Sequence, residues 1–449
     1  MGQEARLIGA GEMAIEAKTI RKIRTRILPF TLLLLVVAFI DRINIGFAAL
    51  TMNRELGLTS RQFGLLTGIF FIGYFLFEIP SNLLLHKIGA RVWIARILLT
   101  WGAVAVMSGF VRSVPQLYAM RFLLGLAEAG FSPGIMLYFT YWFRLRERAR
   151  AIAVFTCGLP VASIVGAPLS GLILDHANWL GLSSWRWLLI LEGVPAIACG
   201  FLTYVLLPSR PDEARFLDAD EKKWLRAELA NEEQKKLNEH HYSVVQALTN
   251  GRVWWLASIY FLFEIGLYTM SYWLPQLVQS LSRLYSNSMI GVLVMVPNLV
   301  GLAGMILVSR HSDRELERRR HVAISAMTAG AALLLLGTTR SPFNTVALSC
   351  LLAVGVYSVF GPFWAMPGEF LTGFSAAAGM ALINSVGNLG GFVEPSAVGW
   401  ITERTGSLYG GLAFAGACLF VSATLTLLLP KRGSSPLPPT AMANKTGAA

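Results

Sequence analysis

Two pairs of oppositely charged residues lie inside long apolar runs of the sequence. Asp41 and Arg42 are adjacent within residues 27–50. Arg121 and Glu128 lie seven residues apart in the string RFLLGLAEAGFSPG, so they share one face of a helix, about 10 Å apart along its axis. Charges inside an apolar helix are costly and usually mark a site or a pathway. The two pairs therefore predict a chamber for an anion and a proton.

The residue types define the chemistry of this chamber. An arginine suits a carboxylate, because its planar guanidinium donates two parallel hydrogen bonds and keeps its charge. With Asp41 ionised, Arg42 is expected to be partly neutralised by its neighbour, whereas a protonated Asp41 leaves Arg42 freer to hold an anion. The six histidines lie near span ends or in loops, so carboxylates are predicted to carry the proton. The alternative is that both pairs are structural ion pairs between helices.

The composition excludes a soluble protein. Of the 449 residues, 55% are hydrophobic and 14% are charged, whereas a soluble chain spends about a quarter of its residues on charged types. The net charge of +12 does not indicate nucleic-acid binding, because the cations lie in short loops beside the apolar runs. We predict an all-α protein that crosses the membrane many times.

Hydropathy predicts twelve spans, and the distribution of Lys and Arg places both termini in the cytoplasm. The predicted spans are 27–50, 62–85, 92–111, 115–139, 149–174, 186–207, 253–279, 286–309, 321–338, 343–366, 374–400 and 407–430. The predicted parts are a cytoplasmic N-terminal segment (1–26), a first bundle of six helices (27–207), a cytoplasmic linker with a surface helix (208–252), a second bundle of six (253–430) and a disordered tail (431–449).

Several kinds of site are not expected. The four cysteines lie in apolar runs without paired spacing, so neither a disulfide nor a metal site is predicted. No nucleotide motif or catalytic triad is found, which argues against a membrane enzyme and against any cofactor other than protons as the coupling ion. Glu78, Glu192 and Glu369 are interpreted as braces of helix ends near loops, and the roles of Glu264 and Glu394 stay open.

Two loops at equivalent positions resemble a known signature. The loop after the second span reads IPSNLLLHKIGARVW, and the loop after the eighth reads GMILVSRHSDRELERRR. With the division into six and six spans, they resemble the major facilitator superfamily, whose signature joins helices 2 and 3. In the first copy Asn82 and His86 replace the signature's Gly and Asp. The residues that match, and that we assign to gating loops, are Lys87, Gly89, Arg91, Asp313 and Arg314.

Further strings narrow the resemblance. AFIDRINIGFAAL, FEIPSNLLLHKIGARVWIARI, RFLLGLAEAGFSPGIMLYFTYWF, WRWLLILEG, GLYTMSYWLP, RHSDRELERRRHV and ALINSVGNLGGF together resemble the anion:cation symporter family, in its bacterial tartrate and phthalate permease branch. The resemblance runs from about Arg21 to Leu429. It implies two six-helix bundles (the major facilitator fold) around a central cavity, alternating access, and co-transport of an organic anion with protons.

The resemblance also implies roles for individual residues. Asp41 and Glu128 match the proton-coupling acids. Arg42 matches the arginine that meets the substrate carboxylate, and Arg121 matches its supporting arginine. The other residues assigned to the substrate cavity are Tyr268, Trp273, Trp364 and Asn388.

The function predicted from the sequence is proton-coupled import of a small organic anion across the bacterial cytoplasmic (inner) membrane. A hydroxylated or dicarboxylic acid such as tartrate, or a sugar acid, suits Arg42 and Asn388. An aromatic carboxylate such as phthalate is the alternative if Tyr268, Trp273 and Trp364 form an apolar wall. A passive anion facilitator could share every motif. A monomer in the lipid bilayer is expected.

Overall fold

The computed structural model describes residues 2–238, 248–282, 284–369 and 373–429, and within these ranges every regular element is a helix. The predicted disordered tail (431–449) lies outside the described residues. The helices of the first group are α1 (Gly2–Leu56), α2 (Ser60–Ile88), α3 (Ala90–Ser108), α4 (Val114–Glu128), α5 (Phe131–Thr140), α6 (Leu145–Thr156), α7 (Gly158–His176) and α8 (Ser184–Leu206).

A connecting segment leads to the second group. It contains the 3-10 turn η1 (Pro211–Glu213) and the helix α9 (Ala219–Asn238), which occupies the part of the linker where a surface helix is predicted. The second group consists of α11 (Gly251–Leu281), α12 (Asn287–Glu315), α13 (Arg319–Leu336), α14 (Pro342–Ala365), η2 (Pro367–Glu369), α15 (Gly373–Asn388), α16 (Gly390–Thr405) and α17 (Leu408–Leu428).

Ten helical segments among the described residues are long and apolar enough to cross a membrane. Two of the twelve predicted spans are not among them. The span predicted at 321–338 corresponds to α13, which begins with Arg319, Arg320 and His321. The span predicted at 374–400 is divided into α15 and α16, each of 16 residues.

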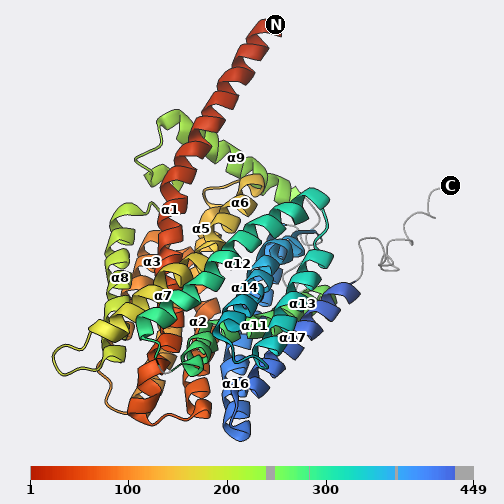
Figure 1. Ribbon diagram of the computed structural model, residues 1–449. Coiled ribbons are helices and arrows are strands. Elements are labelled where there is room, and N and C mark those ends of the chain that lie inside the picture. Colours follow the sequence, from red (N-terminus) through yellow and green to blue (C-terminus); the bar gives the residue numbers. More distant parts are fainter. Residues whose placement is uncertain (1, 239–247, 283, 370–372, 430–449) are drawn as a thin grey trace.

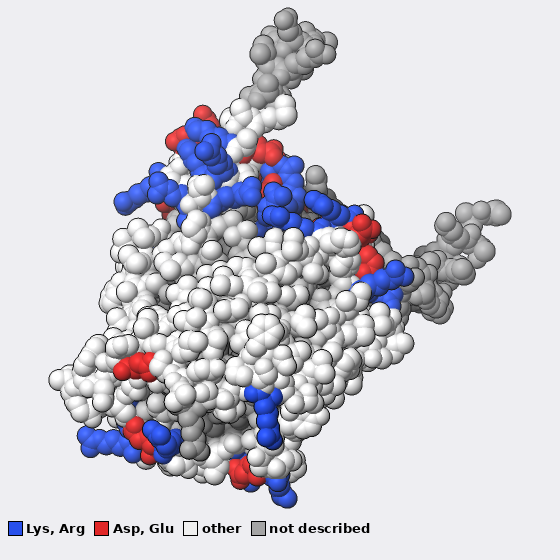
Figure 2. All heavy atoms as spheres, viewed as in Figure 1, with Lys and Arg blue, Asp and Glu red and all other residues white. Residues whose placement is uncertain are grey.

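The surface of the molecule is banded. Figure 2 shows a broad band without charged side chains, and Lys and Arg gathered at the end that carries the N-terminal part of α1, α6 and α9. We call this the basic end. Few charged groups lie at the opposite end in this view (Figure 2). A belt of apolar side chains between two polar ends is the surface that a lipid bilayer requires.

The span predicted at 115–139 is interrupted directly after Glu128. Gly130 has φ +83°, in the left-handed region, and separates α4 from α5. A Cβ at Gly130 would lie 2.4 Å from Ser81 Oγ, so neither the backbone nor the space admits a larger residue. The break places Glu128 at the C-terminal end of α4. Glu128 nevertheless lies inside the apolar segment Val114–Thr140 and not in a loop.

The two groups meet along three seams, in which α1 packs on α11, α2 on α16, and α7 on α12. Glycine allows close approach: a Cβ at Gly64 would lie 1.9 Å from the Pro395 carbonyl oxygen, and one at Gly171 would lie 2.4 Å from that of Asn287. The seams are also hydrogen-bonded at the end opposite the basic end. There Asp175 accepts from the backbone N–H groups of Asn287 (3.1 Å) and Ser288 (2.7 Å).

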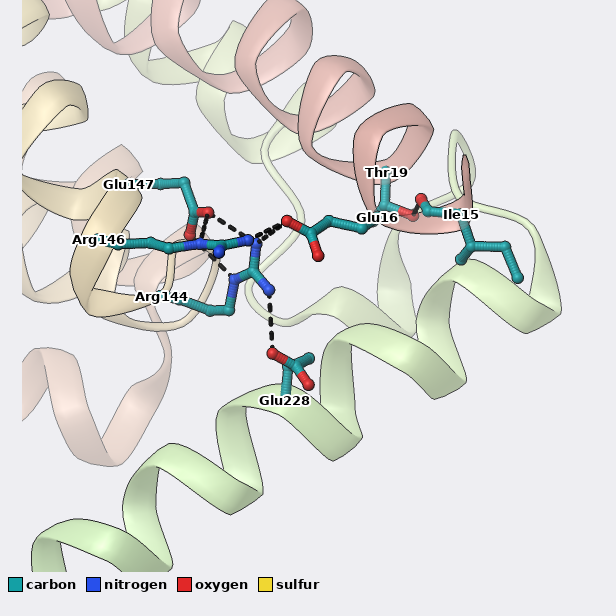
Figure 3. A network of polar contacts seen from close by, with 7 residues as sticks. All are labelled: Ile15, Glu16, Thr19, Arg144, Arg146, Glu147 and Glu228. Carbon is teal, nitrogen blue, oxygen red and sulfur yellow. Dashed lines mark hydrogen bonds and ion pairs between the residues drawn. The ribbon is translucent and has the colours of Figure 1, made fainter. Parts of the chain in front are cut away.

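The helix α9 is held against the first group by ion pairs (Figure 3). Arg144, at the start of α6, donates to Glu16 of α1 (2.9 Å), to Glu147 (2.7 Å) and to Glu228 of α9 (2.9 Å). We call this set of four residues the α9 clamp. Its side chains come from three segments that are far apart in the sequence, so the clamp fixes the linker to the first group.

A second set of ion pairs supports the α9 clamp. Lys22 of α1 lies 2.8 Å from Glu221, and Lys18 lies 3.0 Å from Asp218. Hydrogen bonds from Lys18 and Lys22 lower the pKa of the Asp218 carboxyl. A carboxyl whose pKa is lower in the folded state contributes stability above its unfolded pKa and loses it as the pH falls through the lowered value. This contact therefore persists at neutral pH and is weakened as acid protonates Asp218.

We expect Arg144→Gln to loosen α9 while leaving the spans in place. Glu16 and Glu228 would lose a shared partner whose side chain is only 9% exposed, at a cost of about 1–2 kcal/mol, which is about 10-fold faster local opening. Hydrogen–deuterium exchange of residues 219–238 measures this change. The matched control is Arg226→Gln, because Arg226 pairs with Asp212 at an exposed site. Equal exchange in both variants would contradict the role of the clamp.

Candidate functional site

A buried ion pair joins α1 to α4. The Arg42 guanidinium donates from Nη2 to Glu128 Oε1, and the two residues are 9% and 1% exposed. On its other side, Arg42 Nη1 lies 3.5 Å from the hydroxyl of Tyr268 on α11. The guanidinium carbon is 5.3 Å from the centroid of the Phe70 ring and 5.2 Å from that of Tyr74. Arg42 therefore faces both groups of helices, at the centre of the molecule.

A second buried guanidinium has no ion-pair partner in the part of the chain that the structure describes. Arg121 is 2% exposed, and its Nε and Nη2 atoms have no hydrogen-bond partner. Its guanidinium carbon lies 5.5 Å from the same Phe70 ring that contacts Arg42. Burial of a charge without a hydrogen-bonded partner costs several kcal/mol, so this group is a ready receptor for an anion.

The structure corrects both local pairings inferred from the sequence. Asp41 accepts a hydrogen bond from the indole N–H of Trp101 (2.6 Å), and Asn44 lies 3.4 Å away. The prediction that Asp41 partly neutralises Arg42 is wrong, because adjacent residues of a helix project about 100° apart. Glu128 is paired with Arg42 rather than with Arg121. The four charged residues do lie together, as predicted, but the pairing is between helices.

Unpartnered polar atoms occur in this cluster and on the helices α11 and α16. Buried groups normally find hydrogen-bond partners, so each exception indicates a water, an ion or a ligand that completes it. The unpartnered atoms on α1, α4, α11 and α16 are Arg42 Nε, Arg121 Nε and Nη2, Glu128 Oε2, Glu264 Oε2, Tyr272 Oη, Trp273 Nε1 and Glu394 Oε2. Donors and acceptors are both present, which suits a ligand that carries a carboxylate together with hydroxyl groups.

Of the four residues assigned to the substrate cavity, Tyr268 contacts Arg42 and Trp273 lies further along α11. Tyr268 stacks on Tyr272 with ring centroids 5.5 Å apart, and its ring contacts Phe71 edge-on at 4.7 Å. Trp273 contacts the Phe63 ring edge-on at 5.3 Å. These contacts join α11 to α2, so both residues lie where the two groups meet.

The other two residues lie elsewhere in the second group. Trp364 packs in a separate aromatic cluster, with its ring centroid 5.1 Å from that of Tyr260 and 5.5 Å from that of Phe363. Asn388 is 7% exposed and ends α15 at the break before α16. Neither makes a described contact with Arg42 or Arg121, so their assignment to the substrate stays a prediction.

The residues assigned to gating loops lie at the ends of α2 and α12. Gly89 joins α2 to α3 with φ +100°. Arg91 donates to the Leu207 carbonyl (2.7 Å) and to Glu213 (2.5 Å), which ties α3 to the linker. Asp313 pairs with Arg318 at 2.6 Å. Lys87 and Arg314 are exposed. The described contacts of Arg91 are with the first group and its linker, and that of Asp313 is within the second group. Neither residue makes a described contact between the two groups, so a gating role stays a prediction.

The position of Glu78 was wrongly predicted from the sequence. Glu78 is 3% exposed inside α2, and it accepts hydrogen bonds from Asn384 Nδ2 and Ser385 Oγ of α15, both at 2.9 Å. Its interpretation as a brace near a loop is wrong, because it joins the first group to the second. An acid in the string FEIPSN carries no signal for a partner 300 residues away. Glu192 also lies inside its helix, α8, rather than near a loop, and it accepts from Ser170 of α7 at 2.7 Å.

Metal binding finds no support among the described residues, which contain no group of three or more His, Cys, Asp or Glu side chains able to hold an ion. The four cysteines are free and lie on four different helices or helix ends.

Comparison with known proteins assigns the family. The pattern that defines the Major Facilitator Superfamily matches residues 31–395. The "Putative tartrate transporter" of Agrobacterium vitis is 45% identical over 417 residues, which cover 93% of this chain and 96% of that one. The "Quinolone resistance transporter" of Acinetobacter baumannii is 38% identical, with 93% and 96% covered.

The fold agrees with this assignment. The crystal structure of a D-xylose–proton symporter superposes with a TM-score of 0.71 and 14% sequence identity, covering 90% of this chain and 97% of that one. The resemblance read from the sequence is therefore confirmed, as is the prediction that the chain is not an enzyme. This multi-pass membrane transporter belongs to the major facilitator superfamily.

Proposed function

We propose that the protein is a proton-coupled symporter that imports a small organic anion. The observation that carries this proposal is the buried guanidinium of Arg121, which has unpartnered N–H groups and shares the Phe70 ring with Arg42. Two arginines on one aromatic ring form a receptor for carboxylate oxygens, since each guanidinium can donate two parallel hydrogen bonds.

The proposed coupling of proton and anion transport arises because Glu128 and the substrate carboxylate compete for the Arg42 guanidinium. While Glu128 is ionised, it occupies the Arg42 guanidinium that a substrate carboxylate would use. When Glu128 takes up a proton, the ion pair is lost and Arg42 can bind the substrate instead. The proton and the anion then cross together, and loss of the proton restores the ion pair and expels the anion. Asp41, which is 1% exposed and bonded to Trp101, is the second proton-coupling acid of the proposal.

The substrate is proposed to be a tartrate-like hydroxy or dicarboxylic acid, or a sugar acid. The supporting observations are the paired arginines, the unpartnered hydroxyl of Tyr272 and the name of the Agrobacterium relative. An aromatic carboxylate is the second candidate, because Phe70, Tyr74 and Tyr268 line the approach to Arg42.

The proposed orientation places the basic end in the cytoplasm, with both termini, because cytoplasmic loops carry the excess of Lys and Arg. We also propose that α13 and the α15–α16 segment complete twelve spans, and that the protein works as a monomer in the inner membrane. The close seams opposite the basic end support alternating access, with the described state closed toward the outside.

The test is uptake of labelled tartrate into proteoliposomes under an inward proton gradient. A gradient of about one pH unit permits about tenfold accumulation for each coupled proton. We expect accumulation that a protonophore abolishes, with unlabelled phthalate and galactonate ranking the substrate classes by competition. Uptake that ignores the gradient would favour a passive facilitator. No uptake and no competition, from folded protein, would contradict the anion proposal.

A further inference from the structure

The most unusual buried acid outside the arginine cluster is Glu394 on α16. It is fully buried, and its Oε2 atom has no hydrogen-bond partner. Its Oε1 atom lies 2.9 Å from the hydroxyl oxygen of Thr269 on α11. No base pairs with it among the described residues. A carboxylate in this position would be a buried charge with only neutral donors, the Thr269 hydroxyl and the Trp273 indole, beside it.

The Thr269 hydroxyl has two oxygen acceptors within hydrogen-bond distance. The Thr269 hydroxyl oxygen lies 2.8 Å from the carbonyl oxygen of Ile265 and 2.9 Å from Glu394 Oε1. A hydroxyl has one proton to donate, and a carbonyl can only accept. If Thr269 donates to Ile265, the contact with Glu394 needs a proton from the carboxyl group. A carboxylic acid satisfies both distances, with Thr269 donating to Ile265 and accepting from the acid, whereas a carboxylate leaves one hydroxyl proton for two acceptors.

The surroundings of Glu394 are tightly packed. Its neighbour Pro395 has its carbonyl oxygen 1.9 Å from where a Cβ on Gly64 of α2 would lie. A Cβ on Gly391 would lie 2.4 Å from the ring of Phe71. The Phe63 ring of α2 packs edge-on against Trp273, one turn along α11 from Thr269. Glu394 therefore lies at the junction of α2, α11 and α16, where α2 and α16 meet without room for another side chain.

The elements around Glu394 offer no cation. Residues 62–73 of α2 and all of α15 contain no titratable group, and α17 contains only Tyr409 and Cys418. Residues 260–279 of α11 contribute Glu264 and the tyrosines Tyr260, Tyr268 and Tyr272. On α16 itself, Glu403 accepts from the backbone of Arg61 at the far end of the seam, and Arg404 lies over the Trp400 ring.

We propose that Glu394 is a proton-binding residue that controls the seam between α2 and α16. The seam closes when the Glu394 carboxyl carries a proton, and it parts when the proton leaves, because an ionised carboxylate must regain water. This inference rests on the alternating access of the proposed function. It adds to that function a proton-dependent step at the end of the molecule opposite the basic end, separate from the pair of Arg42 and Glu128.

The test follows closure of the seam in substrate-free protein. The four native cysteines are replaced by Ser, and Arg61→Cys and Glu403→Cys are introduced at the mouth of the seam. The yield of crosslinking by a short bifunctional thiol reagent is measured from about pH 6 to about pH 9. With Glu394 present, we expect the yield to fall about fivefold across this range, relative to Glu394→Gln, which imitates the protonated acid and stays closed.

Two further variants make the result specific. Glu394→Asp keeps a titrating group and should retain the pH response, and Glu264→Gln removes a neighbouring buried acid and should also retain it. Equal pH dependence with and without Glu394, or loss of the response in Glu264→Gln, would overturn the proposal. Because no substrate is used, a responsive seam in a protein that takes up no anion would contradict the proposed function alone. Gradient-driven uptake with an unresponsive seam would contradict this inference alone.

Discussion

Arg121→Gln is expected to weaken substrate binding about 100-fold or more while leaving the protein folded. Loss of one charged partner from a buried carboxylate contact costs about 3 kcal/mol, and each 1.4 kcal/mol is a tenfold change in affinity. In the substrate-free protein the same change removes a guanidinium with two unpartnered nitrogen atoms. The thermal unfolding temperature should therefore be unchanged or higher. Substrate protection against unfolding, measured over a range of tartrate concentrations, gives both quantities at once.

The matched control for Arg121→Gln is Arg96→Gln. Arg96 also lies in a membrane helix, but its guanidinium carbon is 4.6 Å from the Trp93 ring on its own helix, away from Arg42 and Glu128. We expect this variant to bind substrate normally. If Arg121→Gln binds as tightly as the unmodified protein, Arg121 is a structural group and the receptor must be sought elsewhere.

The second large effect is expected from Glu128→Gln, which should separate transport from its driving force. The amide is neutral like a protonated acid, so Arg42 becomes available to the substrate at every pH. Exchange of internal for external substrate should persist, whereas accumulation under a gradient of about one pH unit should fall from about tenfold to about equal concentrations. The unmodified protein should bind substrate more tightly as the pH falls, and the variant should show no such dependence.

The control for this second prediction is Glu192→Gln, which alters a buried acid that is bonded to Ser170 within the first group. Its accumulation should match that of the unmodified protein. Full gradient-driven accumulation by Glu128→Gln would show that another acid couples the proton, and Asp41→Asn would then be the decisive variant. Loss of exchange together with accumulation would show instead that Glu128 is needed to hold Arg42 in place.

Most of the fold could be predicted because lipid imposes long apolar helices that hydropathy detects. The predicted spans differ from the observed helices where a helix is interrupted or begins with charged residues. Gly130 in its left-handed conformation divides the fourth span, which a Gly within an apolar run does not reveal. The string NLGG likewise hides the break between α15 and α16. The length of α1 was also missed, since its first 26 residues are polar and owe part of their order to Arg144 and α9.

The members of the central site could be predicted, but their partners could not. A charged residue in an apolar run is conspicuous in a sequence, so Asp41, Arg42, Arg121 and Glu128 could be singled out as candidates. Their contacts depend on how helices rotate against each other, which periodicity does not fix. Trp101 gave no signal, because a tryptophan in an apolar run is usually a packing residue, yet its indole N–H binds Asp41.

The α9 clamp bears on the order in which the protein is made. The partners of α9 in α1 and at the start of α6 precede it in the chain, so the ion pairs of Glu228 and Glu221 can form as soon as residue 238 is available. The 211 residues that follow require about 10 to 40 s of synthesis at roughly 5–20 residues per second. During that interval α9 can bind to the first group, and the first group can reach its folded structure. The second group is then inserted beside a partner that is already folded.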